Sequence, residues 1–83
     1  MTVVKNKLLL NLDKLHTTEL GILRIKKNLS LETNDVVAWC KGIISKSDSV
    51  IMEKGKNYYI SMADYVITVN STSYTIITAH IKN

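Results

Sequence analysis

Apolar residues in the first part of the chain recur at spacings of three and four, which is the period of an α-helix. Between residues 4 and 15 they are Val4, Leu8, Leu12 and Leu15. This spacing predicts one helix over residues 4–15 with a single apolar face. Lys7 and Lys14 would share a neighbouring stripe of that helix.

A second helix is predicted to begin at Thr17 or Thr18, either of which would cap its first turn, and to run to about Asn28. Its buried face would carry Ile22, Ile25 and Leu29. Leu20 and Leu23 fall on the opposite, basic side, so they would contact another helix or a partner protein. The first alternative is favoured because so short a chain has little core.

A third helix is predicted to begin at Thr33, with Asp35 in its first turn, where a carboxylate interacts favourably with the helix dipole. Cys40 and Trp39 belong to a wide apolar arc on this helix. We therefore interpret Cys40 as a core thiol, because buried thiols in apolar surroundings are unreactive.

After Ser45 the chain becomes rich in β-branched and aromatic residues, which predicts four short antiparallel strands. Their predicted ranges are 50–53, 58–62, 65–69 and 74–80. Pairing Val69 with Tyr74 would set Ile67 opposite Ile76 and would place His80 at the margin of the apolar face.

These elements predict an α+β fold, with two or three N-terminal helices packed on one face of a four-stranded antiparallel sheet. We expect a single domain over residues 1–83, helical over residues 3–45 and with the sheet over residues 48–81. With 83 residues the chain leaves room for one compact unit. Because its core is small, a homodimer is among the assemblies we consider.

Composition and charge narrow the expected class of protein. The single cysteine excludes an intramolecular disulfide, and neither a signal peptide nor a membrane segment is recognisable, so we expect a cytoplasmic protein without membrane contact. The net charge of +4 is concentrated in residues 1–28, which hold six Lys and Arg against two acidic residues. Such a field attracts polyanions, of which RNA or another nucleic acid is the expected partner, although it is also typical of ordinary solvated helices.

Several segments resemble a family of small bacterial and phage proteins known only as a domain of unknown function. The resemblance covers roughly residues 5 to 81 and implies no activity. Its segments include His-Thr-Thr-Glu-Leu-Gly at residues 16–21, Lys-Gly-Lys-Asn at residues 54–57 and Thr-Ile-Ile-Thr-Ala-His at residues 75–80.

The arrangement of helices before an antiparallel sheet is also distantly similar to the barnase, colicin and RelE-like ribonuclease superfamily. That resemblance implies metal-free RNA cleavage by a toxin-like endoribonuclease. The chain departs from the RelE-like pattern because its only arginine is Arg24, outside the predicted strands. This absence favours the alternative of a non-catalytic interaction module of a phage or mobile element. Such a module would bind a host protein or nucleic acid through its basic helices.

Metal-free RNA cleavage needs an acid, a base and donors for the phosphate charge. His16 and His80, the only histidines, are the candidate acid and base. The candidate substrate-binding residues are Arg24, Lys54, Lys56, Tyr59, Thr75 and Thr78, with Tyr58 as an alternative stacking residue. In the non-catalytic alternative, the binding surface would consist of Lys7, Lys14, Arg24 and Lys27. No metal-ligand spacing and no nucleotide-binding loop is present, so we expect no metal and no cofactor.

Overall fold

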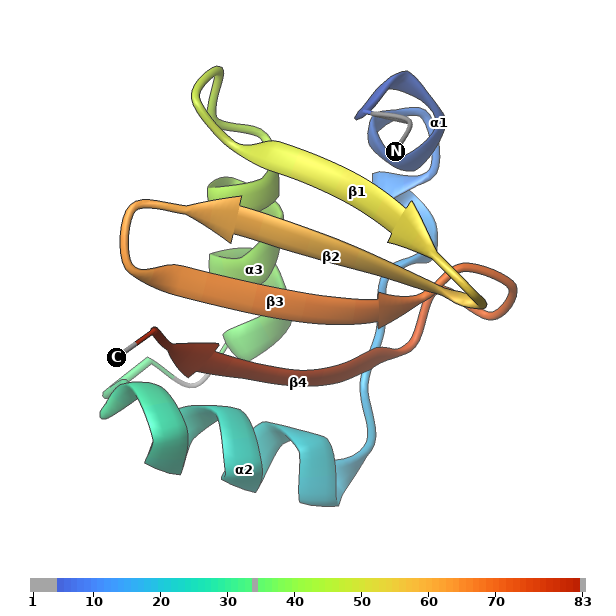
Figure 1. Ribbon diagram of the computed structural model, residues 1–83. Helices are drawn as coiled ribbons and strands as arrows, with labels where there is room; N and C mark the ends of the chain where they lie inside the picture. Colours follow the sequence, from blue (N-terminus) through green and yellow to red (C-terminus); the bar gives the residue numbers. More distant parts are fainter. Residues whose placement is uncertain (1–4, 34, 83) are drawn as a thin grey trace.

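The computed structural model describes residues 5–33 and 35–82. Three α-helices and a short 3-10 helix precede four strands (Figure 1). Their bounds are α1 Lys5–Leu9, η1 Leu12–Lys14, α2 Glu19–Leu29, α3 Val36–Ile44, β1 Val50–Lys54, β2 Asn57–Met62, β3 Tyr65–Asn70 and β4 Ile76–Ile81. All neighbouring strands are antiparallel, in the order β1-β2-β3-β4. The predicted α+β class is confirmed.

The first helix is shorter than predicted. Val4 lies outside the described residues, and α1 ends at Leu9 because Asn11 interrupts its hydrogen bonds. The side-chain Nδ2 of Asn11 donates to the Lys7 carbonyl at 2.9 Å, and the Asn11 N–H turns to the carbonyl of Leu8 at 3.0 Å. An asparagine side chain that takes a backbone carbonyl in this way competes with helix continuation. The prediction of one continuous helix to residue 15 was therefore wrong.

The helices α2 and α3 each begin at a residue whose side-chain oxygen accepts a hydrogen bond from a backbone N–H of the first turn. Thr18, one of the two predicted caps, accepts a hydrogen bond from the Gly21 N–H at 3.0 Å. At α3 the cap is Asp35 rather than the predicted Thr33, because its carboxylate accepts from the Ala38 N–H at 2.9 Å. Thr33 lies two residues before this cap, and its hydroxyl accepts a hydrogen bond from the N–H of Asp35 at 3.1 Å.

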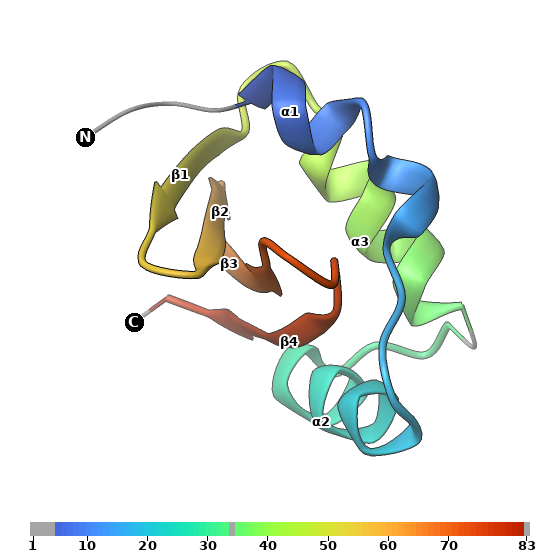
Figure 2. The same cartoon turned by 90° about the vertical axis from the view of Figure 1, so that its right-hand side faces the viewer.

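Helix α3 lies against one face of the sheet, α2 runs along the β4 edge and α1 lies near the β1 edge (Figure 2). Between α3 and the sheet lies the core, whose fully buried members include Cys40, Ile44, Ile60 and Ile67. Burial in this core raises the pKa of the Cys40 thiol from 9.0 to about 12. The prediction of a core thiol is confirmed.

Helix α2 covers the edge strand β4. The Thr17 hydroxyl donates to the Ile76 carbonyl at 2.9 Å, and Nδ2 of Asn28 donates to the Ala79 carbonyl at 3.3 Å. These side chains occupy acceptors that an open edge strand would offer to another chain.

The outer side of α2 differs from the prediction. Leu20 and Leu23 are 66% and 64% exposed, so they do not pack against another helix. The favoured interpretation of these leucines was wrong, because α2 turns its buried face, with Ile25 and Leu29, to the sheet.

The β3–β4 pairing is shifted relative to the prediction. Ile67 pairs with Ala79 rather than Ile76, and a bulge at Thr68 and Val69 adds a further irregularity. The shift arises because the connecting loop extends to Thr75, which delays the start of β4 to Ile76. His80 consequently pairs with Val66 on the face opposite to Ile67, so its predicted place on the apolar face was wrong.

Candidate functional site

The β1–β2 turn and the β3–β4 loop lie together at one end of the sheet. The Lys56 carbonyl accepts hydrogen bonds from both the N–H and the hydroxyl of Ser71, each at 2.8 Å. Gly55, between the two lysines of the turn, has a φ of 62°, a conformation that glycine adopts without strain. The turn that carries Lys54 and Lys56 is thereby fixed to the neighbouring loop.

The β3–β4 loop is organised by the side chain of Asn70. Its Oδ1 accepts from the N–H groups of Thr72 and Ser73, each at 2.9 Å. Tyr74 follows with a φ of 58°, which is uncommon for a bulky residue. Its N–H donates to the Asn70 carbonyl at 2.9 Å, and this bond closes the loop.

His16 joins the segment between η1 and α2 to this loop. Its N–H donates to the Tyr74 carbonyl at 3.2 Å, and its carbonyl accepts from the Ile76 N–H at 2.7 Å. On the side chain, Nδ1 lies 2.9 Å from the Lys14 carbonyl and Nε2 lies 3.0 Å from Oγ1 of Thr75.

The Lys14 carbonyl determines that Nδ1 is the hydrogen-bond donor of the His16 ring. A carbonyl only accepts hydrogen bonds, so Nδ1 must carry a proton. In the neutral ring Nε2 is then an acceptor, and the Thr75 hydroxyl donates to it. Ser73 Oγ lies 2.8 Å from Thr75 Oγ1 and extends this chain of polar groups.

Positive charge surrounds this end of the sheet. Nζ of Lys14 lies 5.9 Å from the centre of the Tyr74 ring, within cation–π range. Lys54 and Lys56 are exposed on the adjacent turn. The carboxylates on the same elements are those of Asp13, on η1, and Glu53, on the helix-facing side of β1.

The sheet face turned away from α3 carries no helix among the described residues (Figure 1). We call it the outer face and define it by three cross-strand rows. The rows are Lys54–Asn57–Asn70, Met52–Tyr59–Thr68–Thr78 and Val50–Ser61–Val66–His80. Within the described strands, none of these rows contains a carboxylate. The outer face therefore combines one aromatic ring, hydroxyls, apolar side chains and the cation of Lys54 without a negative charge.

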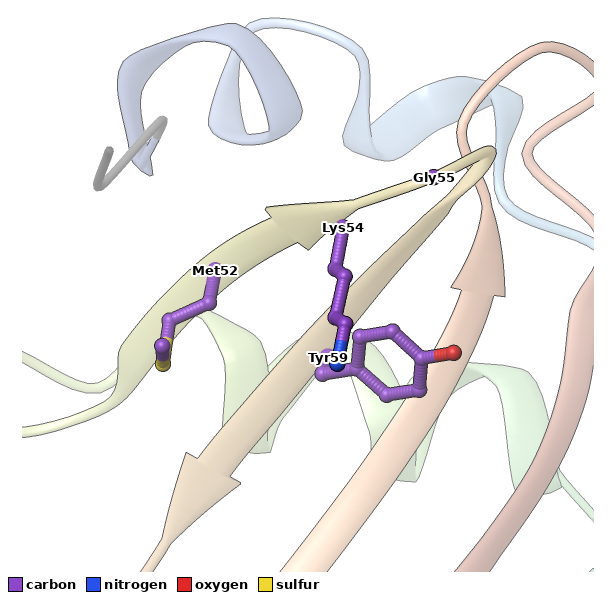
Figure 3. A pocket seen from close by; sticks show the side chains of 4 residues that line it. All are labelled: Met52, Lys54, Gly55 and Tyr59. Atoms are coloured by element: carbon purple, nitrogen blue, oxygen red, sulfur yellow. The ribbon is translucent and has the colours of Figure 1, made fainter. Parts of the chain in front are cut away.

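A hollow of about 510 Å³ opens on this face and is lined by Met52, Lys54, Gly55 and Tyr59. Figure 3 shows the three larger side chains projecting from the same side of the β1–β2 hairpin. The Tyr59 hydroxyl accepts a hydrogen bond from Nδ2 of Asn57 at 3.3 Å, and this contact orients the half-buried ring.

The structure brings some of the predicted site residues together. The loop end gathers His16, Lys14, Lys56 and Thr75, and the adjoining outer face adds Lys54, Tyr59 and Thr78.

The two histidines lie at opposite ends of β4. His16 is bridged to Thr75, and His80 follows Thr75 by five residues, which corresponds to about 16 Å along a strand. His80 shares its end of the sheet with Asp64, whose carbonyl accepts from the Lys82 N–H. The arrangement does not form one acid–base pair from both histidines.

The remaining predicted cations also lie elsewhere. Arg24 and Lys27 are on α2, along β4, at the edge of the sheet opposite to β1, and Lys7 is on α1. Tyr58, the alternative stacking residue, is fully buried on the helix-facing side. Burial, together with the nearby Tyr74 and Glu53, raises the pKa of Tyr58 to about 12.

Residues 9–80 match the model of a protein family that is described as a protein of unknown function, DUF3781. The chain belongs to the DUF3781 family. No curated protein and no solved structure matches it. The comparisons thus support the resemblance to a family of unknown function and give no support to a resemblance to ribonucleases.

Two further structural findings bear on the chemistry of this DUF3781 protein. Within residues 5–33 and 35–82, no group of three or more His, Cys, Asp or Glu residues is arranged to hold a metal ion. In the same residues, no helix has the length and apolar character needed to cross a membrane.

Sequence reasoning missed residues that build the site. Asn70 and Ser73 organise the loop around Thr75, and Met52 and Asn57 frame Tyr59. The run Asn-Ser-Thr-Ser at residues 70–73 contained a usable signal, because an asparagine followed by small polar residues favours a turn held by the asparagine side chain. Met52 and Asn57 give no such signal, since only the strand register places them beside Tyr59.

Proposed function

We propose that this protein binds RNA through the outer face of its sheet and the adjoining β1–β2 turn. The observation that carries the proposal is the outer face itself, which presents Tyr59, hydroxyl groups and Lys54 without a carboxylate. Phosphates are attracted by such cations, and bases stack on exposed aromatic rings in a sequence-tolerant way. Lys14 and Lys56 extend the positive surface at the loop end.

Binding is favoured over cleavage by the placement of the histidines. A toxin-like endoribonuclease would need an acid and a base at one phosphate, whereas His16 and His80 lie at opposite ends of β4. His16 has the better position for catalysis, because Lys14 orients its ring and Thr75 supplies a neighbouring hydroxyl. Cleavage is therefore an outcome to be monitored in the binding experiment.

The test measures the affinity of the protein for a short labelled RNA at several salt concentrations, in EDTA. We expect Lys54→Gln with Lys56→Gln to weaken binding and to flatten the slope of log K against log salt by about 1.4, because each phosphate contact to a single strand contributes about 0.7. Lys82→Gln, which removes one charge at the opposite end of the sheet, is the control, and its effect is compared per charge removed.

The outcome contradicting this proposal is an unchanged affinity in the double variant, or an effect as large in Lys82→Gln. Gel analysis of the same RNA reports on cleavage. Products that appear with the wild type and disappear with His16→Ala would establish catalysis at the loop end.

A second candidate function is supported by the exposed side of α2. Leu20 and Leu23 lie there beside Arg24, at spacings that place them on one helical face. Two largely exposed leucines next to a cation fit a docking surface for an acidic, amphipathic segment of a partner protein. This surface corresponds to the non-catalytic interaction module.

That candidate is tested with wild type and a Leu20→Ser, Leu23→Ser variant as bait. The expected result is a partner that binds purified wild type with a measurable affinity and that the variant does not bind. Equal retention by both proteins would contradict docking on α2.

A further inference from the structure

The hollow beside Tyr59 is shallow and is lined by four residues of the β1–β2 hairpin, so it suits one flat group laid on it. Its volume of about 510 Å³ falls within the roughly 300–1,000 Å³ that is typical of ligand pockets. Gly55 contributes no side chain to the lining, and Figure 3 shows the side chain of Lys54 running from β1 toward the Tyr59 ring. The hollow is wide open to solvent rather than enclosed, so a flat group can enter it.

The chemistry of the lining fits a heteroaromatic ring that is linked to a phosphate. Tyr59 offers a π face, and the Asn57 contact to its hydroxyl limits the rotation of the ring. Met52 supplies a polarizable thioether, which makes favourable contacts with aromatic rings. Lys54 lines the same hollow and extends its positive charge toward the Tyr59 side chain (Figure 3).

We propose that this hollow receives one unpaired RNA base, which stacks on Tyr59 while Lys54 contacts a flanking phosphate. The proposal rests on the proposed function and names its substrate class as single-stranded RNA. A base inside a duplex is paired at its edge and stacked on both faces, so it is not available to the hollow. Single strands expose these faces, and proteins bind them on aromatic platforms within positively charged grooves.

The cross-strand row that contains Tyr59 continues over the outer face beyond the hollow. Thr68 and Thr78 follow Tyr59 across β3 and β4; Thr68 is buried, whereas the half-buried Thr78 offers a hydroxyl donor and acceptor to the neighbouring nucleotide. Because no carboxylate interrupts the described part of this row, a strand of RNA meets no negative charge along it.

The experiment uses a twelve-nucleotide RNA that carries one 2-aminopurine, either single-stranded or annealed to its complement. Affinity and 2-aminopurine fluorescence are measured with wild type, Tyr59→Leu, Tyr59→Phe and Lys54→Gln. We expect the single strand to bind at least tenfold more tightly than the duplex, with quenched fluorescence. Tyr59→Leu should lose roughly five- to a hundredfold in affinity and abolish the quench, whereas Tyr59→Phe keeps the ring and the quench.

Several results would overturn the inference. Equal affinity for the single strand and the duplex would contradict an unpaired base, and an unchanged quench in Tyr59→Leu would contradict stacking on this ring. If Lys54→Gln weakens binding and Tyr59→Leu does not, RNA binding stands and the base site falls. If the wild type binds neither RNA, both proposals fail. Circular dichroism of each variant establishes that the protein is folded.

Discussion

His16 and Thr75 are 59 residues apart in the chain, yet they are joined twice in the fold. Their backbones form a parallel bridge, and Nε2 of His16 lies 3.0 Å from Oγ1 of Thr75. This pair fixes the segment between η1 and α2 to the loop that precedes β4. The helical first half and the stranded second half are thereby connected at the proposed RNA-binding end.

The energetic coupling of this pair is measurable by a double-mutant cycle. We expect His16→Ala and Thr75→Val to show a coupling of roughly 0.5–1.5 kcal/mol, near the lower end because His16 is exposed. The measurement is urea unfolding of the wild type, both single variants and the double variant. Strictly additive losses would mean that the side-chain contact contributes nothing.

The two glycines inside helices predict opposite effects of the same substitution. A Cβ at Gly21 would collide with Oγ1 of Thr17, which holds the Ile76 carbonyl, so Gly21→Ala should destabilise the fold by about 1–3 kcal/mol. At Gly42 a Cβ meets no atom within 4 Å, so Gly42→Ala should stabilise the fold by about 0.5–1 kcal/mol. Thermal unfolding of the pair checks both signs. A gain in both proteins would show that Thr17 moves aside without cost.

The buried Cys40 predicts a loss of stability at alkaline pH. The folded thiol has a pKa of about 12 against an ordinary value of 9.0, so its contribution is complete below pH 9. Between pH 9 and pH 12 the unfolded thiol ionises first, so the free energy of unfolding falls as pH rises. Urea unfolding from about pH 8 to about pH 11 should therefore give a steeper decline for the wild type than for Cys40→Ala. Parallel declines would contradict this assignment.

The hydroxyl of Tyr58 is buried, and although the Tyr74 side chain lies close enough to raise its pKa, no hydrogen bond of good geometry reaches it within the described residues. Removing an unpaired buried hydroxyl relieves its desolvation cost, so Tyr58→Phe should raise the free energy of unfolding by about 1 kcal/mol. Tyr59→Phe serves as the matched control, since it removes a hydroxyl that accepts from Asn57 and should lower stability slightly. A clear loss in Tyr58→Phe would contradict this prediction and indicate that Tyr74 or a bound water satisfies the hydroxyl.

The class of the fold and most of its elements could be predicted from the order of residues. The spacing of apolar residues predicted the helix that begins after Thr18, and the β-branched second half predicted four antiparallel strands. These features are local, because helix caps and apolar periodicity depend on residues within one or two turns. The core position of Cys40 followed in the same way from its apolar neighbours.

Which candidate residues meet depends on contacts between distant segments. The face of the sheet on which His80 lies follows from the β3–β4 register, which differs from the predicted one because the loop held by Asn70 extends to Thr75. The bridge between His16 and Thr75 joins the two halves of the chain, and no periodicity encodes such a contact. The outer face around Tyr59 is likewise a product of strand order and register, since its members come from four separate strands.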